Sequence, residues 1–314
     1  MVELHLHLDG SLSEKTVRKI VSEEGLVIPE IFSGFSLSPF LQYKSENGSL
    51  ADYLKCFELP IKVLQTPNAV RFACMKLCEE LEQEGVRYAE IRFAPQFHTA
   101  KGYSQEEILS AAIEARDYAS LLGVEIDYIL CAMRGQSSKA NEETLELALK
   151  YLGKGVVALD LAGDEAGYPT EQYTDLFTYA VKKGLPFTIH AGEAAGPESI
   201  ETALRLGAWR IGHGVAAIND IELMNDLAKH QIPLEMCPTS NVQTKAVQDI
   251  SEHPLVKFLE KGIAVTVNTD NRTVSDTTLK KEFRAIRSIP GYREEYDRIL
   301  RWNSEKSRFR ELNK

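Results

Sequence analysis

The stretch VEIDYILCAMRGQSSKANEETLELALKYLGKGVVALDL, residues 124–161, contains one full unit of the pattern that decides the fold. Residues 156–161 are nearly all apolar, as a strand buried on both faces of a parallel sheet should be. Residues 124–131 are also rich in strand-forming side chains. Residues 141–152, which lie between the two runs, form a helical stretch. A strand, a helix and a second strand in this order predict a parallel β–α–β unit.

The same alternation continues in both directions along the chain. Eight candidate strands can be marked, at residues 2–7, 86–93, 124–131, 156–161, 186–190, 209–213, 232–237 and 263–268. A glycine precedes four of the strands, where a left-handed residue usually ends a helix: Gly85, Gly123, Gly184 and Gly262. Eight alternating units in 314 residues predict an α/β fold, a single (β/α)8 TIM barrel over residues 1–314.

The first connection is much longer than the others. Residues 13–85 separate the first two strands, and this is too long for a plain loop, so we expect extra helices inserted after the first strand. The insertion follows the carboxyl end of a strand, where the active sites of such barrels lie. A helical lid over the site is therefore expected.

The composition limits the partners. The chain has 46 acidic and 36 basic residues and a net charge of -10, so it lacks the basic field that binds nucleic acid or anionic membranes. The five cysteines show neither a disulfide framework nor a zinc-cage spacing, and the N-terminus is not an apolar signal peptide. We expect a soluble, cytoplasmic protein. Its oligomeric state is not decided by the sequence.

Polar residues gather at the carboxyl ends of the candidate strands. His5 and His7 are two apart on one strand, so their side chains point to the same side. Asp270 follows the eighth strand, which neighbours the first in a closed barrel, and His190 ends the fifth. Three imidazoles and a carboxylate that converge at a barrel mouth suit a divalent metal. The alternative is a set of separate core histidines, each hydrogen-bonded to the backbone.

Three more residues at these strand ends each have two or more interpretations. Glu193 could exchange a proton beside the metal, or it could be a carboxylate at the start of a helix. His213, between two glycines, could be a fourth imidazole ligand, a base for water or a buried structural histidine. The backbone N–H of Gly163 could face a ligand, or the glycine could only make the turn.

Taken together, these segments resemble the adenosine deaminase family of the metal-dependent amidohydrolase superfamily, most closely its bacterial members. The matching motifs follow the family's order: VELHLHLDGSL at 2–12, DLAGDE at 160–165, IHAGE at 189–193, RIGHG at 210–214, CPTSN at 237–241 and VNTDN at 267–271. The resemblance implies zinc-dependent hydrolytic deamination of adenosine and 2′-deoxyadenosine to inosine and 2′-deoxyinosine, with release of ammonia, as in purine salvage.

The resemblance also implies a role for each matching residue. One zinc ion per chain would be bound by four of them: His5, His7, His190 and Asp270. Glu193 would donate a proton to purine nitrogen 1. His213 would orient the attacking water and help to deprotonate it.

Further matching residues would bind the nucleoside. The N–H of Gly163 would meet nitrogen 3, and Asp9 would hold the ribose 5′-hydroxyl. Asn271 stands where many members have an aspartate that meets nitrogen 7, and its amide can still donate there. The apolar face of a lid helix would close over the purine, with Leu50, Tyr53, Leu54 and Phe57. The spacing of that last set is equally typical of an amphipathic helix packed on a core.

Two departures from the family pattern and two rival functions remain. Only Met1 precedes the first strand, where relatives have a short leader, and the tail after about Ile289 does not follow the pattern well. The first rival is a deaminase of another 6-aminopurine, such as adenine or AMP; the family's adenine deaminases usually have Glu where Asp9 stands. The second is a non-catalytic nucleoside-binding protein, which should have lost a metal ligand or the proton donor.

Overall fold

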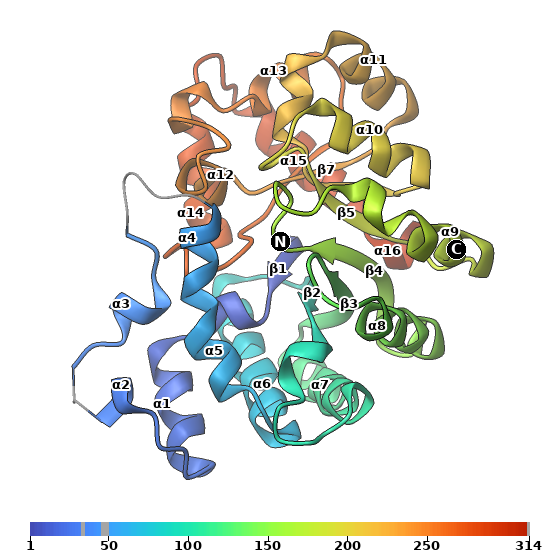
Figure 1. Ribbon diagram of the computed structural model, residues 1–314. Coiled ribbons are helices and arrows are strands. Elements are labelled where there is room, and N and C mark those ends of the chain that lie inside the picture. The colour runs from blue at the N-terminus through green and yellow to red at the C-terminus, as the bar shows by residue number, and fades with distance from the viewer. Residues whose placement is uncertain (33–34, 45–49, 313–314) are drawn as a thin grey trace.

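The computed structural model describes residues 1–32, 35–44 and 50–312, and in it a ring of helices surrounds a central set of parallel strands (Figure 1). The strands are β1 Val2–His7, β2 Tyr88–Phe93, β3 Glu125–Met133, β4 Val156–Ala162, β5 Thr188–Ala191, β6 Arg210–His213, β7 Leu234–Met236 and β8 Val265–Val267. They pair in sequence order as β1-β2-β3-β4 and β5-β6-β7-β8. Bridges between Leu159 and Phe187 and between Leu6 and Asp270 join the two halves. The predicted (β/α)8 barrel is confirmed.

The helices alternate with the strands as expected. The α-helices are α1 Glu14–Glu23, α2 Pro29–Phe32, α3 Ser38–Leu41, α4 Leu50–Leu54, α5 Glu58–Val63, α6 Pro67–Glu84, α7 Gln105–Leu121, α8 Ser138–Tyr151, α9 Thr174–Lys183, α10 Pro197–Leu206, α11 Ile221–His230, α12 Pro238–Gln243, α13 Leu255–Glu260, α14 Leu279–Ala285, α15 Glu295–Lys306 and α16 Phe309–Leu312. The 3-10 helices are η1 Asp9–Ser11, η2 Lys55–Phe57, η3 Pro95–His98, η4 Thr170–Tyr173, η5 Val215–Asn219, η6 Ile250–Glu252 and η7 Ile286–Ser288.

All eight predicted strands exist, but four, β2, β5, β7 and β8, begin two residues later than expected. Val86, Ile232 and Ile263 are apolar residues that close the turn after a helix and do not pair in the sheet. Their backbone N–H groups donate to carbonyls five residues earlier, as in the bond from Val86 to Leu81 O. The four glycines predicted to end helices all have positive φ, for example +78° at Gly85. A closing turn of this kind needs a buried apolar residue just after the glycine, and composition alone does not separate that residue from the strand.

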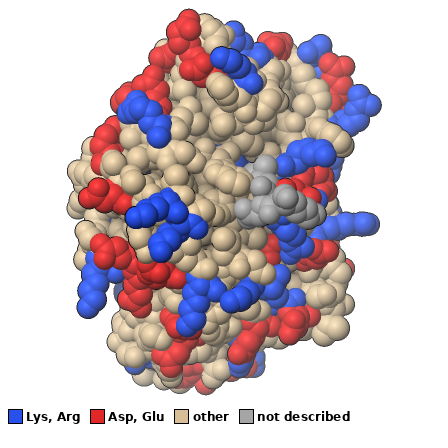
Figure 2. All heavy atoms as spheres, turned by 90° about the vertical axis from the view of Figure 1, so that its right-hand side faces the viewer, with Lys and Arg blue, Asp and Glu red and all other residues tan. Residues whose placement is uncertain are grey.

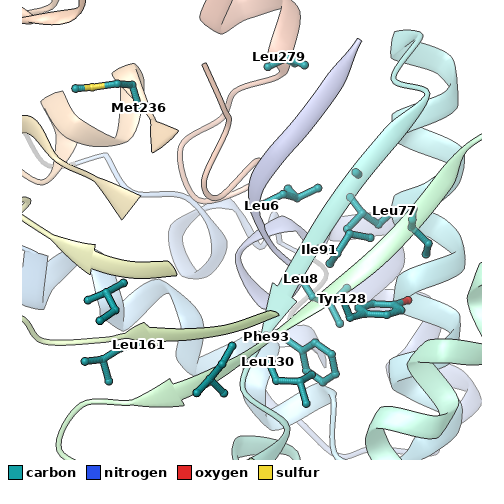
Figure 3. Close-up of a cluster of buried hydrophobic side chains, with 14 of the residues drawn as sticks. Leu6, Leu8, Leu77, Ile91, Phe93, Tyr128, Leu130, Leu161, Met236 and Leu279 are labelled. Atoms are coloured by element: carbon teal, nitrogen blue, oxygen red, sulfur yellow. The ribbon is translucent and has the colours of Figure 1, made fainter. Parts of the chain in front are cut away.

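The long first connection contains helices, as predicted. Helices α1 to α6 and η2 all lie between β1 and β2. Residues 33–34 and 45–49 of the predicted 13–85 insertion lie outside the described residues. Helix α6 packs on the barrel, and its Leu77 belongs to the same buried cluster as Ile91 of β2 and Tyr128 of β3 (Figure 3). The insertion is therefore part of the continuous core in at least this helix.

The C-terminal tail, which departs from the family pattern in sequence, nevertheless completes the barrel wall. Tyr296 and Leu300 of α15 are buried in the core. The Asn303 side chain donates to the backbone oxygen of Val265 in β8. The N–H of Phe309 donates to the buried carboxylate of Glu90, so α16 covers the amino-terminal end of the strands. At the other terminus, Val2 of β1 pairs in register with Tyr88 of β2.

The surface carries both signs of charge. On the face drawn in Figure 2, Lys and Arg are interspersed with Asp and Glu and form no large patch of one sign. Among the described residues, no helix is long and apolar enough to cross a membrane.

Candidate active site

A cavity of about 300 Å³ opens at the carboxyl ends of the strands. The residues that the sequence singled out line it, with one exception. They are His7, Asp9, Leu50, Tyr53, Leu54, Phe57, Gly163, His190, Glu193, His213, Asp270 and Asn271. The exception is His5, which is fully buried. The structure therefore brings all of the predicted site residues to one place.

Four of these side chains direct ligand atoms at one point. The Nε2 atoms of His5 and His7 each lie 3.4 Å from Asp270 Oδ1. The Nε2 atoms of His7 and His190 are 3.3 Å apart. The closure of the barrel produces this geometry, because the Asp270 N–H donates to His5 O and the His7 N–H donates to Asp270 O. These two bonds place the aspartate between the histidines of β1.

Buried carboxylates behind the cluster orient two of the imidazoles. His5 Nδ1 lies 2.7 Å from Glu235 Oε2, and His190 Nδ1 lies 3.1 Å from Asp160 Oδ1. Burial opposes the ionisation of Glu235, but the Arg92 and Arg210 guanidinium groups hold its pKa well below its usual range. An ionised carboxylate only accepts hydrogen bonds, so each ring carries its proton on Nδ1.

This arrangement leaves the Nε2 lone pairs free to bind a metal. His5 Nε2 is buried and has no hydrogen-bond partner in the described structure. Burial also holds the pKa of His7 well below its usual range, which keeps that imidazole neutral. Neutral, oriented imidazoles with one carboxylate are the donor set that a divalent metal such as zinc prefers. The residues present fit a metal ion.

His213 lies on the other side of the same cluster. Its ring centre is 4.9 Å from that of His5 and 5.1 Å from that of His190. A ligand atom from each of His5, His190, His213 and Asp270 falls within 4.8 Å of the others. Distances alone would thus allow either His7 or His213 to complete the ligand set. His213 Nδ1 lies 2.9 Å from the side-chain Nδ2 of Asn241.

Glu193 follows β5 and stands beside this cluster. Its Oε2 lies 3.5 Å from His213 Nε2, and the hydroxyl of Thr244 donates to its Oε1 at 3.0 Å. Burial, followed by the charge of Asp270, raises the pKa of Glu193 to about 7. The carboxyl can therefore carry a proton near neutral pH, as a general acid must.

The loop that carries Glu193 is held by a second carboxylate. Glu165 accepts hydrogen bonds from four successive backbone N–H groups, at Gly192, Glu193, Ala194 and Ala195. Glu165 lies in the DLAGDE motif, but sequence reasoning gave it no role.

Asp9, in η1, also lines the cavity. Burial raises the pKa of this carboxyl to about 6. Its Oδ2 is 4.0 Å from Nε2 of the fully buried His98, a residue that the sequence did not single out. Asp9 does not cap the next helix: Ser13 does so, because its hydroxyl accepts the Thr16 N–H at the start of α1.

Glycines allow the backbone to form part of the cavity wall. Gly163 has φ +101°, a conformation that favours glycine. Asn271 packs on Gly10, where an added Cβ would lie 1.9 Å from Asn271 Oδ1. The oxygen of Asn271 is buried without a hydrogen-bond partner, so the amide has bonding capacity to spare.

The predicted lid residues form one wall. Leu50, Tyr53, Leu54 and Phe57 all line the cavity, but α4 ends at Leu54 and η2 carries Phe57. Tyr53 is buried, and its hydroxyl is 2.7 Å from Ser275 Oγ. The Tyr53 hydroxyl also lies 3.5 Å from Ser240 Oγ of α12. Ser240 in turn donates to Asp270 Oδ2 at 2.6 Å, which links the lid to the metal cluster.

Sequence reasoning missed the residues that support the site from behind. Asp160, Glu165 and Asn241 stand inside motifs that were quoted, and Glu235 is a lone charge in an otherwise apolar predicted strand. That lone charge was a usable signal, because a carboxylate buried in a strand needs a partner. His98 carried no such signal.

Comparisons with known proteins agree with this geometry. The sequence model of a family described as adenosine deaminase matches residues 1–314. An adenosine deaminase of Haemophilus ducreyi is 44% identical over 292 residues, which cover 91% of this chain and 85% of that protein.

Two solved structures are similar in fold along almost the whole chain. An adenine deaminase from Arthrobacter aurescens superimposes with a TM-score of 0.84 at 27% identity, over 98% of this chain and 93% of that one. The N6-methyl-AMP deaminase from Arabidopsis thaliana superimposes with a TM-score of 0.83 at 26% identity, over 98% of this chain and 91% of that one. Both act on purines that carry an amino group or a substituted amino group.

Proposed function

The chain belongs to the adenosine deaminase family, and from this premise we propose that it deaminates adenosine and 2′-deoxyadenosine hydrolytically, with zinc as its metal. Membership makes it a metal-dependent hydrolase that acts on an amidine C–N bond. The observation that carries the proposal is the position of Glu193. A carboxyl with a pKa of about 7 stands at the edge of a cluster of imidazoles and one aspartate, inside a cavity lined by apolar side chains.

Three imidazole nitrogens and one carboxylate oxygen would hold the zinc ion: those of His5, His7, His190 and Asp270. When bound, zinc supplies a water nucleophile of lowered pKa. Glu235 and Asp160 would accept hydrogen bonds from Nδ1 of His5 and His190. This keeps Nε2 of each of these two rings unprotonated and directed at the ion.

Glu193 supplies the proton that this reaction requires. Carbon 6 of an aromatic purine resists attack by water, and protonation of the neighbouring nitrogen 1 makes that carbon electrophilic. Glu193 donates this proton, water adds to carbon 6, and one proton of the water passes to the amino nitrogen. The carbon–nitrogen bond then breaks, ammonia leaves, and the remaining hydroxyl proton returns to Glu193 as the carbonyl forms. His213, at 3.5 Å from Glu193, borders the same point and orients the water.

The nucleoside would lie between Glu193 and Asp9. The N–H of Gly163 meets nitrogen 3, the amide of Asn271 meets nitrogen 7, and the carboxylate of Asp9 accepts the ribose 5′-hydroxyl. The lid side chains of α4 and η2 cover the purine and exclude water. Adenine would leave the buried Asp9 unpaired, and AMP would place its phosphate against a carboxylate, so both should react less well.

A single parallel assay tests this function. The zinc-loaded protein is given adenosine, 2′-deoxyadenosine, adenine and AMP, and deamination is followed by ultraviolet absorbance. The two nucleosides should show the highest kcat/KM. A preference for adenine or AMP would reassign the substrate, and no turnover of any of the four would support a non-catalytic nucleoside-binding protein.

We also propose a cytoplasmic location. All five cysteines are free and buried, which suits a reducing compartment.

A further inference from the structure

A line of buried hydrogen bonds runs from the backbone of α13 to the ring of His213. The Leu255 N–H donates to His253 Nδ1 at 3.3 Å. His253 Nε2 lies 3.2 Å from Asn241 Oδ1, and Asn241 Nδ2 lies 2.9 Å from His213 Nδ1. All three side chains are almost completely buried, with exposed fractions of 2% for His253, 0% for Asn241 and 1% for His213. Water therefore does not compete for these bonds.

The backbone group at the start of the line decides the direction of every bond in it. An amide N–H can only donate, so His253 Nδ1 must accept. Burial lowers the pKa of His253 to about 3, so the ring is neutral and its one proton lies on Nε2. That proton is donated to Asn241 Oδ1. The same amide then presents its NH₂ group to His213 Nδ1, which must accept.

The neutral ring of His213 consequently carries its proton on Nε2, the nitrogen that faces the cavity. His5 and His190 have the opposite arrangement, because their Nδ1 atoms face the carboxylates of Glu235 and Asp160. The chain thus places an acceptor behind two of the three rings that are proposed to bind metal, and a donor behind His213.

We propose that Asn241 and His253 are positioning residues that hold His213 in the Nε2–H tautomer, so that it meets the attacking water as a hydrogen-bond donor. An Nε2 that carries a proton has no lone pair with which to bind a metal or to accept a proton from water. Of the roles open from the sequence, ligand, base or structural residue, the tautomer thus excludes the first two in the resting state. The role of His213 toward the attacking water rests on the proposed function, whereas the tautomer of its ring follows from the hydrogen bonds alone.

The substitution Asn241→Asp tests the proposal with almost no change of shape. A carboxylate accepts from both neighbours, so it should draw the His213 proton to Nδ1 and turn the Nε2 lone pair toward the cavity. The tautomer is read from the imidazole ¹⁵N resonances of the zinc-loaded, histidine-labelled protein, with His213→Gln to assign the signals. We expect protonated Nε2 in the unchanged protein and protonated Nδ1 in the variant.

Turnover supplies the second measurement. Loss of one donor to the reacting oxygen should lower kcat for adenosine by about 10²–10³-fold with little change in KM. Asn219→Asp, the same change at an exposed position of η5, is the control and should leave kcat unchanged. His253→Leu removes the second positioning side chain and should also lower kcat. His253→Gln can both accept and donate hydrogen bonds, so it should retain most of the kcat of the unchanged protein.

Two results would overturn the proposal. One is an Nδ1–H signature for His213 in the unchanged protein, which is decisive even if the Asp variant does not fold. The other is a variant whose tautomer switches while kcat stays the same or rises, because His213 would then act as a base. An unchanged protein that is inactive on every purine but shows the Nε2–H signature would refute the proposed function and still support the positioning role.

Discussion

Glu193 is surrounded by groups that decide whether it holds a proton. It has lost its water and the charge of Asp270 lies nearby, and these two effects outweigh His190 and the Thr244 hydroxyl, which favour the ionised form. A surface glutamate titrates near pH 4, and this one is poised about three pH units higher. The same residue type thus becomes an acid through its surroundings.

The first prediction concerns this proton. Glu193→Gln keeps the size of the side chain and removes the titrating group, so turnover of adenosine should fall by about 10²–10⁴-fold. Zinc content, measured by elemental analysis, should not change, because Glu193 is not among the proposed ligands. Glu201→Gln, an exposed position on α10, serves as the control. A fall in turnover of less than about tenfold would contradict the role of Glu193 as the acid and indicate a structural role.

The second prediction concerns Asp9 and the choice of substrate. A hydrogen bond from the 5′-hydroxyl to this carboxylate should contribute ~1.5–3 kcal/mol. Asp9→Ala should therefore lower kcat/KM for adenosine by about 10- to 150-fold and for 5′-deoxyadenosine much less. Asp226→Ala, at an exposed position of α11, should affect neither substrate. An equal loss on both substrates would contradict recognition of the 5′ end by Asp9.

At the scale of elements, the short helix α12 organises one side of the site. It carries Ser240, which donates to Asp270, and Asn241, which contacts His213. Its first turn is held by a buried carboxylate of α14, because the Thr239 N–H donates to Glu282 Oε2 and the Thr277 hydroxyl bonds to the other oxygen. Two helices that lie next to each other only in the folded chain thus support one side of the site.

The third prediction follows from the burial of that carboxylate, which raises the pKa of Glu282 from 4.5 to about 7. Below pH 4.5 the group is protonated in both the folded and the unfolded chain. As the pH rises toward 7, only the unfolded chain releases its proton, so the free energy of unfolding falls. Above pH 7 this loss is complete.

Glu282→Gln removes the titration and keeps both hydrogen bonds, because an amide can accept from Thr239 and donate to Thr277. Urea unfolding should show the variant to be more stable than the unchanged protein by ~1–3 kcal/mol at pH 8, with little difference at pH 5. A difference that is the same at both pH values would contradict the assignment.

At the scale of the whole molecule, barrel closure and the metal site are one feature. The proposed ligands come from β1, from β5 and from the end of β8, so they join both four-stranded halves of the barrel. Inside the barrel, Arg92 pairs with both Glu235 and Asp160, the two carboxylates that orient ligand imidazoles. Removal of one partner from such a buried network is strongly destabilising.

The fourth prediction concerns the metal. Protein purified without chelator should contain about one zinc ion per chain by elemental analysis. Because the ion binds the folded chain and not the unfolded one, its removal should lower both Tm and activity, and added zinc should restore both. Metal-free protein whose activity is unaffected by chelator would refute the hydrolytic mechanism.

The local sequence by itself determined the eight strands, the glycines that end helices and the site residues that stand at strand ends. These features depend on neighbours in the chain: an apolar run predicts a buried strand, and alternate residues of a strand share a side. His5 and His7 were therefore predictable as a pair. Asp270 could be placed beside them, because closure of a barrel makes its first and last strands neighbours.

Only the tertiary structure decided what stands behind these residues. Glu235 is 230 positions from His5, and His253 acts on His213 through Asn241. Burial set the protonation states of Glu193 and His253, and no property of a single position predicts how much water a side chain will lose. The direction of the hydrogen bonds to His213 came from one backbone N–H that packing brought to His253, because a tautomer is fixed by the groups a ring meets in space.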